Sequence, residues 1–183
     1  MNSRDAVLPP RRALNGKDRV TLITGGAGFV GANLAHRLLS EGRRVLVLDN
    51  LSRPGVERNL AWLEENHAAG LDVMVADIRD AAAVERAVAR ADHVFHFAAQ
   101  VAVTTSLADP REDFAVNALG TLNVLEAARA QRVPPSVLMT STNKVYGGLE
   151  DGLAELAAWL EGQAAVDRVA QASAELSARG LAI

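Results

Sequence analysis

Short apolar runs alternate with segments of helical spacing from residue 20 onward. Residues 20–24, VTLIT, end at a pair of glycines, which is typical of a strand buried on both faces. Similar runs follow at residues 44–49, 71–76, 93–98 and 136–140. Amphipathic spacing predicts the intervening helices at residues 29–40, around Leu60, Trp62 and Leu63, at about 81–90 and at about 111–130.

Helices of this length between strands predict a parallel sheet, because a right-handed crossover returns the chain to the same edge. We therefore expect an α/β fold, a doubly wound Rossmann sheet of about five strands. Gly147 and Gly148 interrupt the pattern, and the residues after them predict two helices without a further strand. The expected domains are a flexible leader at 1–18, a Rossmann domain at 19–147 and a helical tail at 148–183.

A glycine series lies between the first predicted strand and the first predicted helix. The sequence TGGAGFVG at 24–31 places Gly25, Gly28 and Gly31 at regular intervals. In this context the first permits a tight turn, the second lets backbone approach a pyrophosphate, and the third allows close helix–strand packing. The helix N-terminus then presents free N–H groups and a positive dipole end to the phosphates. A tight turn without a ligand is the alternative interpretation.

Acidic residues follow the next two predicted strands. Asp49 can accept hydrogen bonds from both hydroxyls of an adenosine ribose and would repel a 2′-phosphate, which favours NAD over NADP. Arg53 lies close enough in sequence to weaken that preference. Asp77 either meets the edge of the adenine or caps the following helix, a role for which Asp80 competes.

The Ala98–Ala99 pair at the end of the fourth predicted strand either leaves room for the cofactor ribose and nicotinamide or reflects close packing alone. His96, just before it, is expected to be a packed, hydrogen-bonded core histidine, since no second metal ligand stands at a suitable spacing. His36 and His67 are expected at the surface. We predict no metal site.

Composition narrows the classes of function. The chain has 183 residues and a formal net charge of −3, so nothing favours binding to nucleic acid or to an anionic membrane. No apolar run is long enough to span a bilayer, and the N-terminal residues do not resemble a secretory signal. The lack of cysteine excludes disulfides and thiolate metal sites and favours a cytoplasmic location.

Several motifs follow one another in a family order: TGGAGFVG (24–31), Asp49-Asn50, Asp77-Ile78, FHFAAQ (95–100), Asn117 with Gly120-Thr121, and STNKVYG (141–147). In this order and spacing the chain resembles the extended short-chain dehydrogenases, the NAD-dependent sugar-nucleotide epimerases and dehydratases, over about residues 19–147. The loops at 49–60 and 98–106 resemble most those of members that act on CDP-linked sugars.

The resemblance implies NAD as the cofactor and a nucleotide sugar, such as a CDP-sugar, as the substrate. It implies that Thr142 is the catalytic Ser/Thr, which hydrogen-bonds the reacting hydroxyl or carbonyl, and that Asn117 either backs the site or is a structural amide. The implied cofactor-binding residues are Gly25, Gly28, Phe29, Val30 and Gly31 for the pyrophosphate, Asp49, Asn50, Ser52 and Arg53 for the ribose, Asp77 and Ile78 for the adenine, and Ala98, Ala99 and Gln100 for the nicotinamide.

The proton-transfer pair of that family, Tyr-x-x-x-Lys, is missing. The single tyrosine, Tyr146, belongs to the VYG motif upstream of that pair, and the residue four positions later is Glu150. Residues from Gly152 onward resemble the extreme C-terminal helices of the family, so we expect an internal deletion of the catalytic helix, the sixth strand and the substrate lobe. Loss of the general base and of substrate positioning should remove several orders of magnitude in rate.

These features predict an NAD-binding domain that turns over little or no substrate. The first alternative is an active epimerase completed by another subunit, because the deletion exposes apolar surface on the last strand and on the 111–130 helix, which in the family helps to form a homodimer. The second alternative is a non-catalytic NAD-binding module with a structural or regulatory role.

Overall fold

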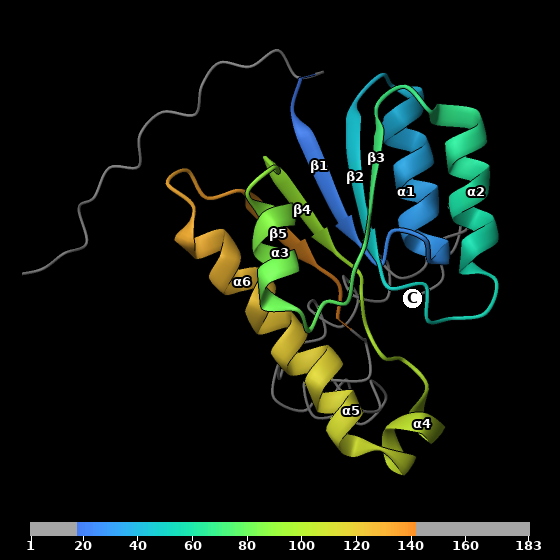
Figure 1. The fold of residues 1–183 in the computed structure, drawn as a ribbon. Coiled ribbons are helices and arrows are strands. Elements are labelled where there is room, and N and C mark those ends of the chain that lie inside the picture. Colours follow the sequence, from blue (N-terminus) through green and yellow to red (C-terminus); the bar gives the residue numbers. More distant parts are fainter. Residues whose placement is uncertain (1–17, 142–183) are drawn as a thin grey trace, which may run out of the picture. The chain divides into compact units, whose positions relative to one another are not determined.

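A computed structural model describes residues 18–141 of the chain (Figure 1). Thr142, Tyr146 and the expected tail helices lie outside the described residues, as do residues 1–17 of the expected leader. The elements in chain order are β1 (Val20–Thr24), α1 (Phe29–Ser40), β2 (Arg44–Asp49), α2 (Val56–His67), β3 (Leu71–Val75), α3 (Ala81–Val88), β4 (His93–His96), α4 (Val103–Ala108), α5 (Pro110–Phe114), the π-helical turn η1 (Ala115–Leu119), α6 (Gly120–Ala130) and β5 (Ser136–Met139).

The strands form one parallel sheet in the order β3-β2-β1-β4-β5. The chain builds outward from β1 to β3 and then returns to place β4 on the other side of β1. This reversal is the topological switch point at which doubly wound sheets bind ligands, outside the carboxyl ends of the strands. The predicted fold class is confirmed.

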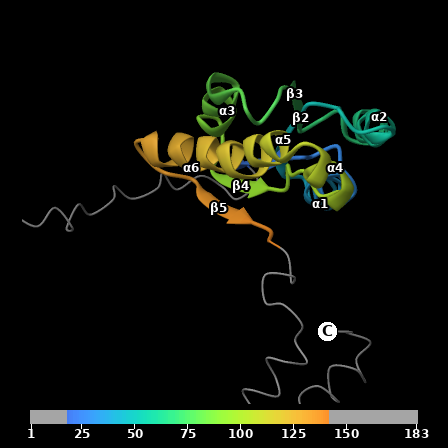
Figure 2. The same ribbon diagram turned by 90° about the horizontal axis from the view of Figure 1, so that it is seen from below.

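Neighbouring residues of each central strand point to opposite faces of the sheet, as the two-residue period requires. Leu22 and Leu46 pack under α3 and α6, in one apolar cluster. Ile23 and Val47 pack under α1 and α2, in a second cluster (Figures 1 and 2). Because both faces of β1 and β2 are covered, these strands are continuously apolar rather than alternating in sequence.

Two differences from the prediction bear on the candidate site. β4 ends at His96 rather than at residue 98, since the Ala98 N–H donates to the Thr24 hydroxyl (3.2 Å) and leaves the ladder. The helix predicted over 111–130 is three consecutive segments, α5, η1 and α6. α4 was not predicted at all: it has no buried residue, and its exposed Val103 and Leu107 give no amphipathic signal.

Candidate functional site

The glycine loop lies directly against the segment that follows β4. Gly25 has a φ of +67°, and a Cβ added there would stand 2.7 Å from the Ala98 backbone nitrogen. Its own N–H donates to the Leu48 carbonyl (2.8 Å), so the loop is fixed to the end of β2 as well. The turn therefore requires a residue with no side chain and with access to positive φ. It places the loop at the switch point between β1 and β4.

The first turn of α1 is open to an anion. Gly28 is its N-cap, and no side chain caps the helix. The first N–H groups of a helix have no partner within it, so these donors face the space outside the loop. A Cβ on Gly31 would stand 2.3 Å from the Gly25 carbonyl oxygen, so only glycine lets helix and loop approach this closely. Phe29 and Val30 are 82% and 56% exposed and do not fill the core beneath the loop.

Asp49 is held beside the glycine loop by backbone donors. One carboxylate oxygen accepts a hydrogen bond from the Ala27 N–H (3.0 Å), and the other accepts one from the Leu51 N–H (2.9 Å). Leu51 has a φ of +55°, a left-handed conformation that is rare for a branched side chain and gathers at functional sites. The strand-end acid therefore points toward the loop, and each of its oxygens keeps a second lone pair for a ligand hydroxyl.

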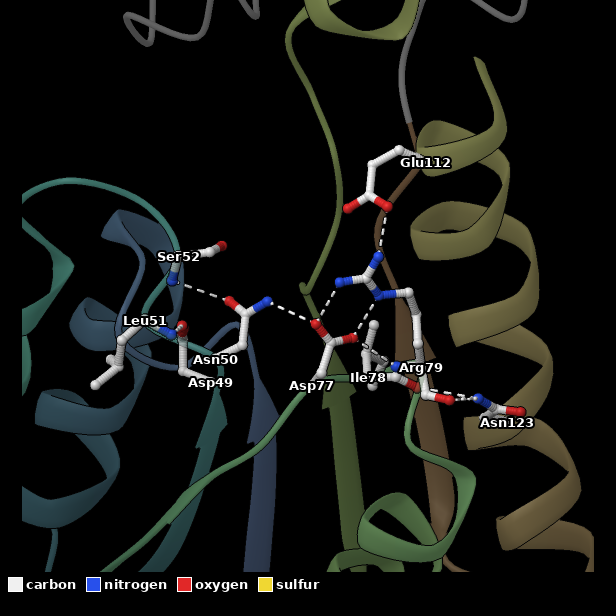
Figure 3. Close-up of polar contacts among 9 residues, drawn as sticks. All are labelled: Asp49, Asn50, Leu51, Ser52, Asp77, Ile78, Arg79, Glu112 and Asn123. Carbon is white, nitrogen blue, oxygen red and sulfur yellow. Dashed lines mark hydrogen bonds and ion pairs between the residues drawn. The ribbon is translucent and has the colours of Figure 1, made fainter. Parts of the chain in front are cut away.

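Asp77 is the centre of a polar network between the β2 and β3 loops and α5 (Figure 3). Its carboxylate accepts from the Asn50 amide (3.0 Å), from the Arg79 N–H (2.8 Å) and from two guanidinium nitrogens of Arg79 (2.8 and 2.7 Å). Hydrogen bonding by Arg79 is the main cause that holds the pKa of the Asp77 carboxyl far below its usual range, although partial burial opposes it. Arg79 also pairs with Glu112 of α5.

The N-cap of α3 is Asp80 rather than Asp77. Asp80 accepts from the Ala83 N–H (3.0 Å) and is the N-cap, so the capping interpretation of Asp77 is wrong. Asp77 remains beside Asn50, whose own oxygen accepts from the Ser52 N–H (3.1 Å). Ile78 is buried, and the Asn123 amide holds its carbonyl oxygen at 3.1 Å. Of the residues expected around the adenosine, Asn50, Ser52 and Asp77 are thus joined by hydrogen bonds.

The segment after β4 is held from two sides. The Asn117 side chain accepts from the Gln100 N–H (2.8 Å) and donates to the Gln100 carbonyl (2.9 Å). Asn117 lies in the π-helical turn η1, a distortion that is common at functional sites. From the other side, Arg53 reaches across from the β2–α2 loop to the Ala99 carbonyl (3.4 Å). Asn117 therefore acts as a structural amide that positions a candidate nicotinamide-binding residue.

Sequence reasoning singled out Asp77 but missed Arg79, Glu112 and Asn123. The only local signal is that Arg79 follows Asp77 by two residues, which suits a turn with a side-chain contact. His96 is confirmed as a buried core histidine, bonded to Thr24 and Thr121. His36 is exposed, and its ring contacts that of His67 (2.7 Å between nitrogens).

Residues 18–141 contain neither a cluster of metal-ligating side chains nor a helix that could cross a membrane. No three side chains of histidine, aspartate or glutamate gather there as a metal site. No helix in the same range combines the length and apolar character that crossing a membrane requires.

Comparisons with known proteins agree with the geometry. The family described as GDP-mannose 4,6 dehydratase matches residues 22–157. The chain belongs to this family of extended short-chain dehydrogenases. CDP-paratose 2-epimerase of Salmonella typhi is 47% identical over 131 residues, which cover 70% of this chain and 38% of that protein. dTDP-glucose 4,6-dehydratase of Mycolicibacterium smegmatis is 42% identical over the same shares of the two chains.

Solved structures give the same assignment. The Thermus thermophilus UDP-glucose 4-epimerase in complex with NAD is 42% identical, with a TM-score of 0.57, over 67% of this chain and 37% of that one. The Bifidobacterium longum UDP-glucose 4-epimerase with NAD⁺ and UDP is 34% identical, with a TM-score of 0.60. This chain therefore spans less than two fifths of the length of such relatives.

Replacing Gly31 tests the close contact between α1 and the loop. In the variant Gly31→Ala the new methyl group would meet the Gly25 carbonyl oxygen at 2.3 Å, so helix and loop must separate. We expect the free energy of unfolding, measured by urea denaturation, to fall by about 1–3 kcal/mol. Ser40→Ala, at the exposed end of the same helix, is the control. Equal stability of the two variants would contradict the packing described.

Proposed function

We propose that this chain is the NAD-binding domain of a protein related to the sugar-nucleotide epimerases and dehydratases. The observation that carries the proposal is the open first turn of α1 beside a strand-end carboxylate, Asp49, across the switch point of the sheet. Gly25 and Gly31 let the glycine loop and the first turn of α1 lie close to the ends of β1 and β4. The space outside the loop therefore suits a diphosphate. The NAD complexes of structural relatives support the same cofactor.

The proposed roles follow the position of each residue. Asp49 accepts the ribose hydroxyls, and the carboxylate disfavours the 2′-phosphate of NADP. Asp77 and Ile78 meet the adenine edge. The pyrophosphate contacts are assigned to Gly25, Gly28, Phe29, Val30 and Gly31, the ribose contacts to Asn50, Ser52 and Arg53 in addition to Asp49, and the nicotinamide side to Ala98, Ala99 and Gln100.

Replacing the strand-end acid tests the cofactor assignment. We expect NAD to bind the wild-type chain, NADP to bind more weakly, and Asp49→Asn to weaken NAD binding about 10- to 100-fold, because charge-assisted bonds to the ribose are lost. Calorimetric titration measures each affinity. Asp72→Asn, on β3 among exposed arginines, is the matched control. No binding of NAD at millimolar concentration would dismiss the proposal.

Catalysis requires more than the cofactor. NAD held by these residues would supply hydride-transfer chemistry, and the reacting hydroxyl would then need a base whose pKa has been brought down toward neutrality. The sequence of this chain offers one tyrosine, Tyr146, followed four residues later by Glu150 rather than lysine. Thr142 corresponds to the residue that would hydrogen-bond the reacting group, without the base that works beside it. We therefore propose that the chain alone is catalytically impaired.

Mixing the chain with NAD and CDP- or UDP-sugars tests this impairment. We expect no change in absorbance at 340 nm and no new sugar signals by NMR, since the loss of a general base alone removes roughly 10²- to 10⁴-fold in rate. Turnover by the purified chain at a rate typical of enzymes would contradict the proposal. Turnover that appears only after a second protein is added would favour the alternative in which another subunit supplies the base.

An exposed apolar stripe favours self-association. Phe114 of α5 is 68% exposed, and Leu122 and Leu125 of α6 are 52% and 43% exposed, with a three-residue spacing that places the two leucines on one side of α6. Leu138 and Met139 of the edge strand β5 are also about half exposed. Exposed apolar side chains that gather on one surface are typical of an interaction site. We assign it to a homodimer, and we place the protein in the cytoplasm because it has no cysteine.

A charge in the stripe tests the dimer. We expect sedimentation equilibrium to show a dimer for the wild type and at least about tenfold weaker association for Leu122→Asp, because the carboxylate would be desolvated in the interface. Ala130→Asp introduces the same charge at the exposed end of α6 and should associate normally. A strictly monomeric wild type would defeat the homodimer. A non-catalytic regulatory module would then be the favoured alternative.

A further inference from the structure

A continuous chain of hydrogen bonds runs through the core beneath the candidate cofactor site. The Ala98 N–H donates to the Thr24 hydroxyl oxygen (3.2 Å), which lies 2.7 Å from Nδ1 of His96. Nε2 of His96 lies 3.0 Å from the Thr121 hydroxyl, which donates to the Asn117 carbonyl (2.6 Å). Five groups, from β1, β4, the segment after β4, η1 and α6, are therefore linked through one imidazole ring.

Each proton in this series of hydrogen bonds has one possible position. The Asn117 carbonyl can only accept, so the proton of the Thr121 hydroxyl is used there, and Thr121 must accept from His96. Nε2 of His96 therefore carries the ring proton, and Nδ1 is an acceptor. The Thr24 hydroxyl donates to that Nδ1 and accepts from the Ala98 N–H. The arrangement is complete only when His96 is the neutral Nε2–H tautomer.

The surroundings keep the ring neutral. His96 is 5% exposed, and burial lowers the pKa of its imidazole from the ordinary value of 6.5. The hydroxyls of Thr24 and Thr121 are its polar contacts in the described part of the chain, and no charged side chain contacts it there. The nearest carboxylate in the network, Asp113, bonds the Asn117 side-chain amide rather than the ring.

Both ends of this series of hydrogen bonds belong to the candidate cofactor site. Thr24 immediately precedes Gly25, the turning residue of the glycine loop. Ala98 begins the segment assigned to the nicotinamide side. At the other end the Asn117 carbonyl lies in the π-helical turn whose side chain holds Gln100. The ring therefore ties the phosphate loop to the nicotinamide segment from below, without touching the space for a ligand.

We propose that His96 is a positioning residue for the cofactor site and that NAD binding requires its neutral Nε2–H form. The inference rests on the proposed NAD-binding function. An added proton on Nδ1 would leave the Thr24 hydroxyl proton without its acceptor and put an uncompensated charge in the core. The Thr24 hydroxyl could still accept from the Ala98 N–H, but it would have to turn its own proton away from the ring, which would disturb the anchor that the Ala98 amide and the glycine loop share. Protonation and NAD binding are therefore antagonistic, and by linkage NAD must lower the pKa of His96.

Nitrogen-15 NMR of the histidine rings tests the tautomer without any substitution. We expect His96 to show a protonated Nε2 and an unprotonated Nδ1 at pH 7.5, and its titration to move to lower pH when NAD is added. His93, which is half-buried on the same strand and lies beside Ser136, serves as the internal reference, and its titration should not respond to NAD. A protonated Nδ1 in His96, or a titration that NAD leaves unchanged, would overturn the proposal.

Variants test the consequence for binding. His96→Phe keeps a ring but removes both contacts, and we expect NAD affinity to fall roughly tenfold. His96→Gln keeps a neutral donor and acceptor and should recover much of that loss. Wild-type affinity should fall as the pH is lowered below the ordinary histidine range, because burial lowers the pKa of His96, whereas the affinity of His96→Gln should not follow this dependence. His93→Gln is the control and should follow the wild type.

The outcomes separate the two proposals. Failure of the wild-type chain to bind NAD at any pH removes the proposed function itself. Normal binding by wild type and by folded His96→Phe, with the same pH dependence, leaves that function intact and overturns the role of His96. If His96→Phe does not fold, the NMR titration and the pH profile of His96→Gln against wild type decide the matter.

Discussion

The close approach of two backbone segments, at the ends of β1 and β4, is the constraint on which the rest of this site depends. Gly25 has no room for a side chain because the Ala98 backbone lies against it. Gly31 has no room for a side chain because the Gly25 carbonyl oxygen lies against it. These contacts leave the first turn of α1 aimed outward with no capping side chain. Any bulk at either glycine would push the helix away from the sheet and remove the geometry that suits a diphosphate.

The features that could be predicted from the sequence are those fixed by residues close together in the chain. The apolar runs of β1 and β2 predict buried parallel strands because both faces are covered, as Leu22 and Ile23 show by packing into opposite clusters. The glycine series and Asp49 were identifiable because their spacing is short and fixed by one strand–turn–helix unit. The same locality explains why helix and strand boundaries agree to within one or two residues in this part of the chain.

Contacts between distant residues explain what could not be predicted. Arg79 meets Glu112 across 33 positions, and neither residue has a periodic or motif signal that marks the other. The early end of β4 depends on the Thr24 hydroxyl taking the Ala98 N–H, 74 positions away. The π-helical turn at Ala115–Leu119 is not visible in the sequence because apolar spacing continues through it, and the bonds of its Asn117 to Gln100 are tertiary contacts. Thr142, the predicted catalytic residue, lies outside the described range.

Two sets of residues come from different parts of the family fold: those proposed to bind the cofactor and those needed for proton transfer. A domain that binds the cofactor without catalysis is consistent with this separation. The adenosine side is built from the loops after β1, β2 and β3, and α5 and α6 support it through Glu112 and Asn123. Each of these partners lies within residues 24–123, before β5. A base beside the nicotinamide would come from later in the chain or from another subunit. On this proposal cofactor affinity and turnover are separable properties: the first depends on residues at the ends of the strands, and the second on a base that those residues do not include.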